Sequence, residues 1–220
     1  HGMCAMLNGM ALHGGWRVFG ATFFVFADYC RPSLRLAALM KLPVIYVFTH
    51  DSFYVGEDGP THEPVEHLAS LRAMPNMTVI RPADATESGA AWVAALKNTT
   101  GPTVLALTRH NLPVIDRRQG PPASQLDRGA YTLWQSGTGL PDLLLIASGS
   151  EVALALKAAR ELAAGRNVRV VSMPSMELFD RQDAAYRHSV LPPACVKRLA
   201  IEAGVAFGWD KYIGPQGRML

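Results

Sequence analysis

The residues best suited to chemistry lie in one short charged stretch, residues 55–66, which reads VGEDGPTHEPVE. Asp58 and Gly59 form a typical turn dipeptide and Pro60 restricts the backbone that leaves it, so a tight turn explains half of the stretch without any function. A turn does not need His62. A carboxylate acceptor together with an imidazole that can donate or accept suits a site that binds sugar hydroxyl groups.

Further polar residues stand where predicted strands end, at residues 49–51, 81–84 and 108–110. Parallel sheets bind ligands beyond the carboxyl ends of their strands. Taken alone, His50 is best interpreted as a hydrogen-bonded structural imidazole and Arg109 as a surface or salt-bridge arginine. At a strand end, however, an arginine suits a phosphate group. The charged stretch follows the first of these ends, so we expect its acids to face a crevice rather than bulk solvent.

Three aromatic residues, Phe23, Phe26 and Tyr29, recur at intervals of three positions. Helical spacing of this kind is typical of a stripe packed in the core. The alternative is a wall on which a flat heteroaromatic ring stacks.

Metal binding and disulfide chemistry are not expected. His50 and His62 lack the spacing of a zinc pair on a helix, and no third ligand accompanies them. Cys4, Cys30 and Cys195 are odd in number and lack metal-ligand or CxxC spacing. We therefore expect reduced core thiols in a cytoplasmic protein.

These residues are set in a chain that alternates apolar runs with amphipathic stretches. Val44–Phe48 and Val104–Leu107 are continuously apolar, as in parallel strands buried on both faces. Asp84 is a predicted helix cap, and Glu87 completes an acidic capping box. The sequence predicts strands within 16–26, 42–51, 77–84 and 102–110, and helices within 33–41, 65–74 and 87–101.

A segment rich in charge, proline and glycine, residues 115–131, separates this unit from a second one. A strand is predicted at 143–150, a helix at 151–165 with Ser150 as cap and Gly165 as stop, and a parallel strand at 168–175. The predicted fold is α/β, with two doubly wound, mostly parallel-sheet domains. We place the first domain at 1–116, the linker at 117–128 and the second domain at 129–220.

Composition excludes several classes of function. The 220 residues are 49% hydrophobic and 18% charged, with a net charge of +3 from scattered basic residues. Neither a nucleic-acid surface nor a membrane patch is expected from this pattern. There is no long apolar run and no leader pattern. The chain starts at His1 without methionine, and we expect it to be a piece of a longer protein.

The string THDSFYVGEDGPTHEPVEHLASLRAMPN, residues 49–76, resembles the signature of the transketolase family. The similarity continues through residues 12–40, 101–114 and 142–159 and so covers essentially the whole chain. The long, irregular, charged GEDGPTHEPVE string makes the resemblance specific.

The resemblance implies a thiamine diphosphate enzyme that moves a two-carbon ketol unit from a ketose phosphate to an aldose phosphate, in the pentose phosphate pathway or the Calvin cycle. The first domain would bind the pyrimidine ring of the cofactor, with Phe26, Phe23 and Tyr29 packed on that ring. A homodimer that holds the cofactor at the subunit interface is implied. The diphosphate and its Mg²⁺ or other divalent cation would bind to a domain outside this chain.

By motif position, His62 would be the catalytic residue of this chain, near the cofactor's reactive carbon and the donor's first hydroxyl group. Asp58 would accept a hydrogen bond from a sugar hydroxyl group. His50 and Arg109 would bind the substrate phosphate. The family's catalytic glutamate precedes the position of His1 and is absent, so we expect the chain alone to be inactive.

Three alternatives remain open at this stage. Dihydroxyacetone synthase would accept formaldehyde. The β subunit of a 2-oxoacid dehydrogenase should lack the phosphate pair His50 and Arg109. A fragment that only dimerises would have no catalytic role.

Overall fold

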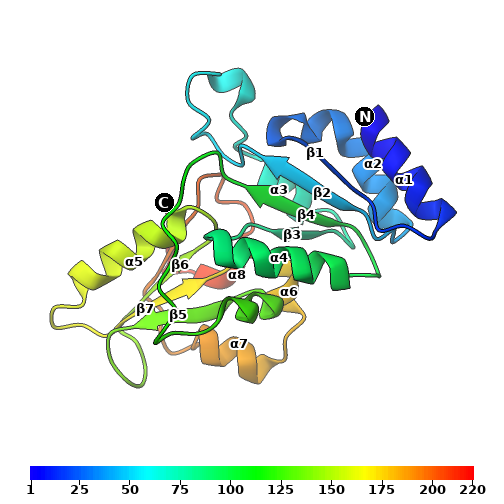
Figure 1. The fold of residues 1–220 in the computed structure, drawn as a ribbon. Helices are drawn as coiled ribbons and strands as arrows, with labels where there is room; N and C mark the ends of the chain where they lie inside the picture. The colour runs from blue at the N-terminus through cyan, green and yellow to red at the C-terminus, as the bar shows by residue number, and fades with distance from the viewer.

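The structure, a computed structural model that describes residues 1–220, contains two α/β domains, one above the other in Figure 1. The upper domain has a four-stranded sheet in the order β1-β2-β4-β3, with every neighbouring pair parallel. Its strands are β1 (Phe19–Phe23), β2 (Ile45–Thr49), β3 (Thr78–Ile80) and β4 (Thr103–Leu107). Its helices are α1 (Gly2–His13), η1 (Phe24–Phe26), α2 (Ala27–Leu39), η2 (Pro60–His62), α3 (His67–Arg72) and α4 (Ala85–Lys97).

The continuous apolar runs of β2 and β4 arise because both faces of this sheet are covered. Tyr46 and Phe48 belong to a core formed with α1, α2 and α3. Ile45 and Val47 point to the opposite face, into a core that includes Ala91 of α4. Successive side chains of a strand alternate between faces, so a strand covered on both sides must be apolar throughout.

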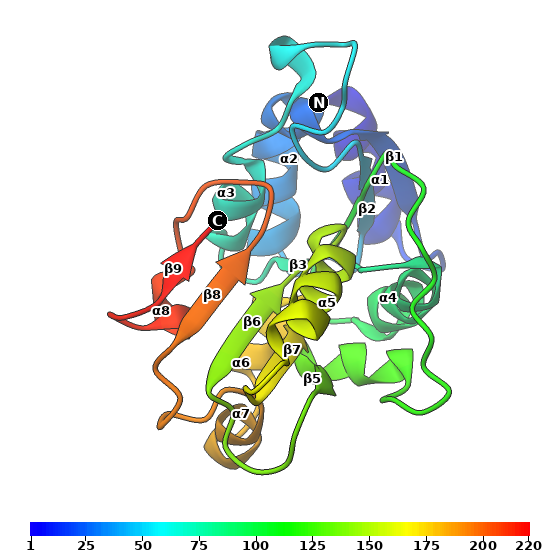
Figure 2. The ribbon, with the colours of Figure 1, turned by 90° about the vertical axis from the view of Figure 1, so that its left-hand side faces the viewer.

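The lower domain has a five-stranded sheet in the order β5-β7-β6-β8-β9, in which only the edge strand β5 is antiparallel to its neighbour. Its strands are β5 (Tyr131–Gln135), β6 (Leu143–Ala147), β7 (Val168–Ser172), β8 (Arg198–Ile201) and β9 (Arg218–Met219). Its helices are α5 (Glu151–Leu162), α6 (Met176–Asp180), α7 (Ala184–Val190) and α8 (Asp210–Ile213). The turned view in Figure 2 shows α5 on one face of this sheet. The predicted fold class is confirmed.

Helix ends show where local prediction was right and where it was wrong. The Asp84 carboxylate accepts a hydrogen bond from the backbone N–H of Glu87 at 2.8 Å, as predicted. The Glu87 carboxylate reaches back to the N–H of Ala83 at 2.8 Å, one residue earlier than in a standard capping box. Ser150 makes no side-chain cap bond, because its hydroxyl group is engaged with Arg81 and Glu151.

Other predicted segments also differ in extent, and the helix predicted within 33–41 begins at Ala27. Within 16–26, only Phe19–Phe23 is a strand, and the chain then turns through η1 directly into α2. The linker contains a short 3-10 helix, η3 (Ala123–Arg128). None of the helices combines the length and apolar character needed to cross a membrane.

The topology brings the carboxyl ends of the first sheet to one edge. Phe23 pairs in register with Thr49, which pairs with Leu107, so the residues that follow β2 and β4 are neighbours. The loop between β2 and α3 stands out from this edge in both ribbon views. The predicted residues at the ends of β2 and β4 therefore share one location.

Candidate active site

Aromatic and imidazole rings gather at this edge of the sheet. The rings of Phe23 and His50 stack with centroids 4.0 Å apart. Phe23 and Phe26 are nearly parallel at 6.2 Å, and His62 meets Phe26 edge-on at 5.7 Å. The structure thus connects both predicted histidines with the predicted aromatic wall.

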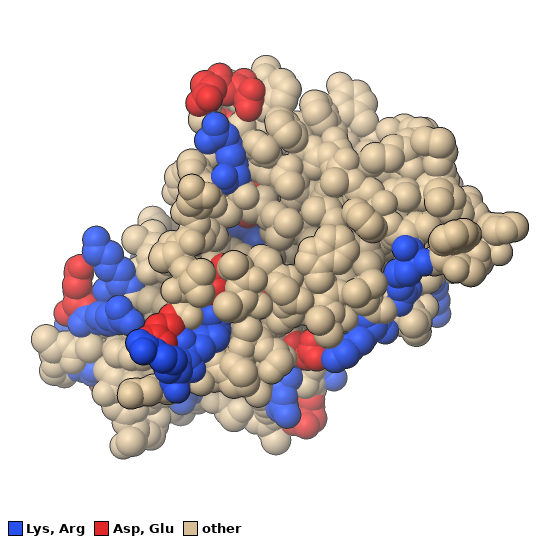
Figure 3. Space-filling model, in the orientation of Figure 1, with Lys and Arg blue, Asp and Glu red and all other residues tan.

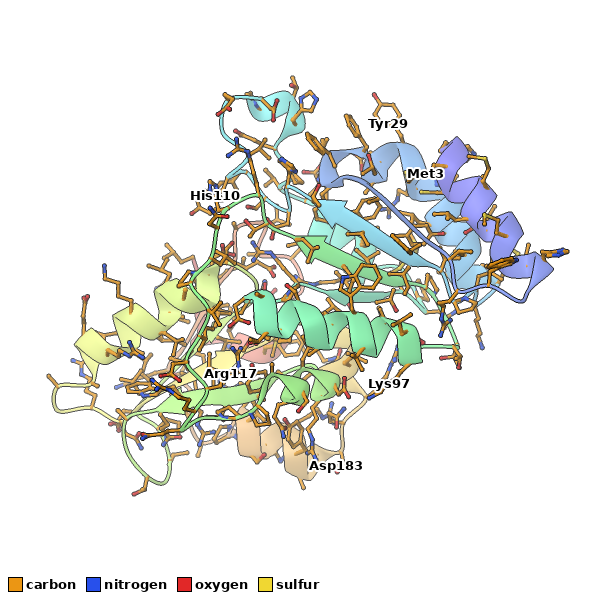
Figure 4. All side chains as sticks on the ribbon, in the orientation of Figure 1. Met3, Tyr29, Lys97, His110, Arg117 and Asp183 are labelled. Carbon is orange, nitrogen blue, oxygen red and sulfur yellow. The ribbon has the colours of Figure 1, made fainter.

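The aromatic stripe is not part of the core, so that interpretation of its spacing is wrong. Phe24, which the spacing passes over, is the fully buried phenylalanine of this segment. Phe23 and Phe26 are only half-buried, and Tyr29 is 72% exposed. Figure 4 shows Tyr29 at the same end of the molecule as the projecting loop. Half-exposed rings on a strand end, a 3-10 turn and a helix start offer faces on which a flat ligand can stack.

The charged loop projects from the strand ends instead of lining a closed crevice. Glu57 and Asp58 are exposed, so in this chain the expectation that they avoid bulk solvent is wrong. Figure 3 shows acidic groups at the tip of the molecule above a basic side chain. The carboxylate of Glu57 lies 3.5 Å from the guanidinium group of Arg109, a long and exposed ion pair. Such pairs contribute little to stability, so Arg109 remains available to another anion.

His62 lies at the end of the turn that Gly59 and Pro60 form. Gly59 has φ 75°, a conformation that favours glycine, and Pro60 begins η2. The Nδ1 atom of His62 lies 2.9 Å from the hydroxyl oxygen of Thr61. The turn therefore places the imidazole beside Phe26.

His50 has an unusual backbone for a residue with a side chain. Its φ is 63°, in the left-handed region. Its Nδ1 atom lies 3.1 Å from the hydroxyl oxygen of Thr49. Such a conformation is uncommon in residues other than glycine and clusters at functional sites.

His110, which the sequence placed at a strand end without a role, connects β4 to the projecting loop. Its Nε2 atom lies 2.6 Å from the carbonyl oxygen of Tyr54. The label in Figure 4 marks it below that loop. The contact holds the base of the loop against the segment that carries Arg109.

Buried ion pairs between the two domains were not predicted. Arg81, fully buried, pairs with Glu151 of the second domain and also donates from Nε to Asp51 of its own domain at 2.7 Å. Arg72 forms two hydrogen bonds with the Glu202 carboxylate, at 2.6 and 2.7 Å. The polar residues at the strand ends drew attention to Arg81 and Asp51. The sequence pattern alone, however, does not distinguish a charged residue that binds a ligand from one that is buried against another domain.

Burial and pairing set the protonation of these groups. Burial raises the pKa of Glu202, but the Arg72 guanidinium, together with Arg81 and a hydrogen bond from Ser148, lowers it to about 2. Burial also raises the pKa of Glu87. The hydrogen bonds that its carboxylate accepts from Tyr131, Ala83 and Ser172 act in the opposite direction but are outweighed. These carboxyl groups belong to the domain interface.

One group of potential metal ligands lies beside the aromatic wall: Asp28, Glu66 and the buried His67. The Nε2 atom of His67 is 3.3 Å from Asp28, whereas its Nδ1 atom is 4.0 Å from Glu66. The two acids thus approach different nitrogens. The arrangement is that of a buried imidazole flanked by two acids, neither of which makes a hydrogen bond to it.

All three cysteines are free and buried, as expected. A cavity of about 830 Å³ lies away from the strand ends and is lined by the linker, β5 and α5.

Comparison with known families matches both domains of the chain. Residues 1–114 match the model of the transketolase pyrimidine binding domain. Residues 129–220 match the transketolase-like C-terminal domain.

Individual relatives agree with the family models. The chain is 61% identical over 219 residues to a transketolase of Bacillus subtilis, covering 99% of this chain and 33% of that protein. It superposes on a transketolase from Leishmania mexicana with a TM-score of 0.92, at 48% identity, over 99% of this chain and 31% of the other. A transketolase from Pichia stipitis in complex with sedoheptulose 7-phosphate gives a TM-score of 0.91 at 41% identity, over 100% of this chain and 32% of the other. The chain therefore spans about a third of the length of the relatives that it matches.

Proposed function

The chain belongs to the transketolase family, and from this premise we propose that the protein of which it forms a part transfers a two-carbon ketol unit from a ketose phosphate to an aldose phosphate. The observation that supports this most strongly is the strand-end cluster, in which His50 stacks on Phe23 and His62 meets Phe26 edge-on. Two imidazoles and two half-exposed phenyl rings on one edge suit an aromatic cofactor beside a polar sugar.

The aromatic wall fits the pyrimidine ring of thiamine diphosphate. Phe23, Phe26 and Tyr29 keep ring faces outside the core. When bound, thiamine diphosphate supplies the nucleophilic carbon and the electron sink that cleavage of a carbon–carbon bond requires. The proposed part of this chain is to hold the ring by stacking, to which each aromatic contact adds roughly 1–3 kcal/mol on the scale of nucleic-acid sites.

The substrate-binding roles are assigned to residues of the projecting loop and of the strand ends. We assign to His62 a hydrogen bond with the donor's first hydroxyl group, next to the cofactor ring, and to Asp58 a hydrogen bond from another sugar hydroxyl group. His50 and Arg109, at the ends of β2 and β4, take the substrate phosphate. A charge-assisted hydrogen bond contributes about 1.5–3 kcal/mol.

A homodimer is part of this proposal. Large apolar side chains remain exposed on α1 and α2, among them Met6 at 66%, Leu39 at 62% and Tyr29 at 72%. Trp16, just after α1, is 70% exposed. Figure 3 shows few charged groups on the face over α1 and β1. An uncharged face that carries several exposed large apolar side chains is typical of a protein interface.

The diphosphate and Mg²⁺ or another divalent cation are assigned to a domain outside this chain. The strand-end cluster offers aromatic rings, imidazoles and Arg109, which suit a ring and an anion but not a hard cation. For this reason we expect the 220-residue chain alone to be inactive and the full-length protein to be active.

The test is Arg109→Ala in the full-length protein, assayed with xylulose 5-phosphate and with xylulose as donors. Loss of one charge-assisted contact should raise the KM for xylulose 5-phosphate about tenfold or more. The KM for xylulose should not change, because this sugar has no phosphate. An equal effect on both sugars would refute the phosphate role, and a wild-type protein inert toward both would refute the proposed function.

A further inference from the structure

The backbone of His50 requires an external constraint. Its φ of 63° lies in a region that side-chain-bearing residues seldom occupy. A residue stays in such a conformation only when its surroundings determine it. On the amino side, His50 is fixed by β2, which ends at Thr49. On the carboxyl side, the chain is anchored at the next residue, Asp51, which is buried.

Asp51 is held by a buried arginine. Its side chain is 2% exposed, and its carboxylate accepts a hydrogen bond from Nε of Arg81 at 2.7 Å. Arg81 follows β3, which is separated from β2 by one strand, β4, in the sheet. Its side chain is 0% exposed. A buried ion pair with good geometry fixes both partners, since either charge alone would be costly in this environment.

Arg81 in turn is fixed by the second domain. Its Nη1 atom donates to the carbonyl oxygen of Ser148 at 2.9 Å and also contacts the carboxylate of Glu151. Its Nη2 atom donates to the hydroxyl group of Ser150 at 3.2 Å. All of these acceptors lie between the end of β6 and the first residue of α5.

The backbones of the two domains are joined at the same point. The N–H of Arg81 donates to the carbonyl oxygen of Pro174 at 2.8 Å, and the N–H of Gly149 donates to the carbonyl oxygen of Arg81 at 3.1 Å. Gly149 has φ 56°, and a Cβ atom there would lie 2.6 Å from Cζ of Arg81. The guanidinium group is therefore enclosed by the second domain.

We propose that Asp51, Arg81 and Glu151 are positioning residues for His50, so that the second domain sets where this imidazole meets the substrate phosphate. The inference rests on the proposed function, in which His50 binds that phosphate. It gives the second domain, which contributes none of the proposed site residues, a defined part in substrate binding. The chain of contacts runs from Glu151 through Arg81 and Asp51 to the backbone of His50.

The decisive variants are Asp51→Asn and Glu151→Gln in the full-length enzyme. Each removes one charge from the chain of contacts while keeping the shape of the side chain. Displacing a binding group by a fraction of an ångström should raise the KM for xylulose 5-phosphate at least about tenfold. The KM for xylulose, and kcat with either sugar, should change by less than about twofold because neither depends on the phosphate contact.

Glu177→Gln is the matched control. Glu177 is another carboxylate at the domain interface, where it accepts a hydrogen bond from the N–H of Val79 at 3.1 Å. It makes no contact with Asp51 or Arg81. The control should lower the melting temperature without changing the ratio of the two KM values, which separates positioning from a general loss of stability.

The outcomes are distinct. A selective rise of the KM for xylulose 5-phosphate in both variants supports the inference. An equal change for both sugars, or no change, overturns it, even though the wild-type enzyme would still show the proposed function. If Asp51→Asn fails to fold, Glu151→Gln decides, because it leaves the Asp51–Arg81 pair intact. A wild-type protein inert toward both sugars overturns the proposed function and this inference with it.

Discussion

Removing the charge of Glu202 tests how far buried ion pairs stabilise this chain. Glu202 is 3% exposed and accepts hydrogen bonds from Arg72 and from the indole N–H of Trp209, at 3.0 Å for the indole. The substitution is Glu202→Gln, which keeps the shape of the side chain. It leaves the Arg72 guanidinium buried without a counter-charge, and breaking a buried pair in this way is strongly destabilising.

The size of the expected loss in unfolding free energy follows from the pKa of the Glu202 carboxyl group. Its pKa falls from an ordinary 4.5 to about 2 in the folded chain, since the combined effect of Arg72, Arg81 and the hydrogen bond from Ser148 exceeds that of burial. At about 1.4 kcal/mol for each pH unit, the charged form contributes about 3 kcal/mol to the free energy of unfolding. Because the folded-state pKa is the lower one, this contribution is present above pH 4.5 and is lost as the pH falls toward 2. At pH 3 about half of it should remain.

The assay is urea unfolding of the 220-residue chain, wild type against Glu202→Gln, followed by tryptophan fluorescence between pH 7 and pH 3. We expect the difference in unfolding free energy to be about 3 kcal/mol at pH 7 and to shrink by about half at pH 3. Asp116→Asn is the control, because Asp116 is exposed and paired with the likewise exposed Arg118, and it should leave the unfolding midpoint unchanged. A difference below about 1 kcal/mol at pH 7, or one that is constant with pH, would refute the reasoning.

Three other predictions address the site and its support. Phe26→Ala in the full-length enzyme should weaken thiamine diphosphate binding by roughly 1–3 kcal/mol, about 5- to 150-fold, because one stacked ring is lost; unchanged affinity in a fluorescence titration would exclude stacking on this ring. Asp58→Ala should reduce discrimination between epimeric acceptor sugars, measured as the ratio of kcat/KM values, and unaltered selectivity would contradict its role. Gly149→Ala should destabilise the chain by about 1–3 kcal/mol in urea unfolding, more than Gly139→Ala, whose φ is also positive but whose surroundings are open; equal losses would show that the contact with Arg81 does not matter.

Periodicity and strand-end reasoning predicted much of the fold, because parallel strands covered on both faces have a plain signature. Val44–Phe48 and Val104–Leu107 both correspond to strands at the centre of the first sheet. The strands β5, β8 and β9 were not predicted. In β5, a register shift between Thr132 and Trp134 accompanies pairing at the sheet edge. In β8, only four residues are in the strand, too few for a clear pattern.

Local spacing was less informative about the site. Phe23, Phe26 and Tyr29 have helical spacing but lie in a strand, a 3-10 turn and a helix, so their period does not describe one helix face. The roles of His50 and Arg109 came from the family resemblance, whereas their shared location follows from the parallel order of β2 and β4. The buried Asp51–Arg81 pair could not be predicted. Its burial depends on residues of the second domain that are more than sixty positions away in the sequence.

The charges buried between the domains also determine how the chain can be divided or recombined. Separating the domains at the linker would expose Arg81 and Glu87 of the first domain to water. Arg81 would lose its partner Glu151, and Glu87 would lose the hydrogen bond from Tyr131. A hybrid that joins one domain to the corresponding domain of a distant relative meets the same difficulty unless the paired residues are transferred together. For protein engineering, the two domains are therefore a single exchangeable module, despite having two sheets and a linker between them.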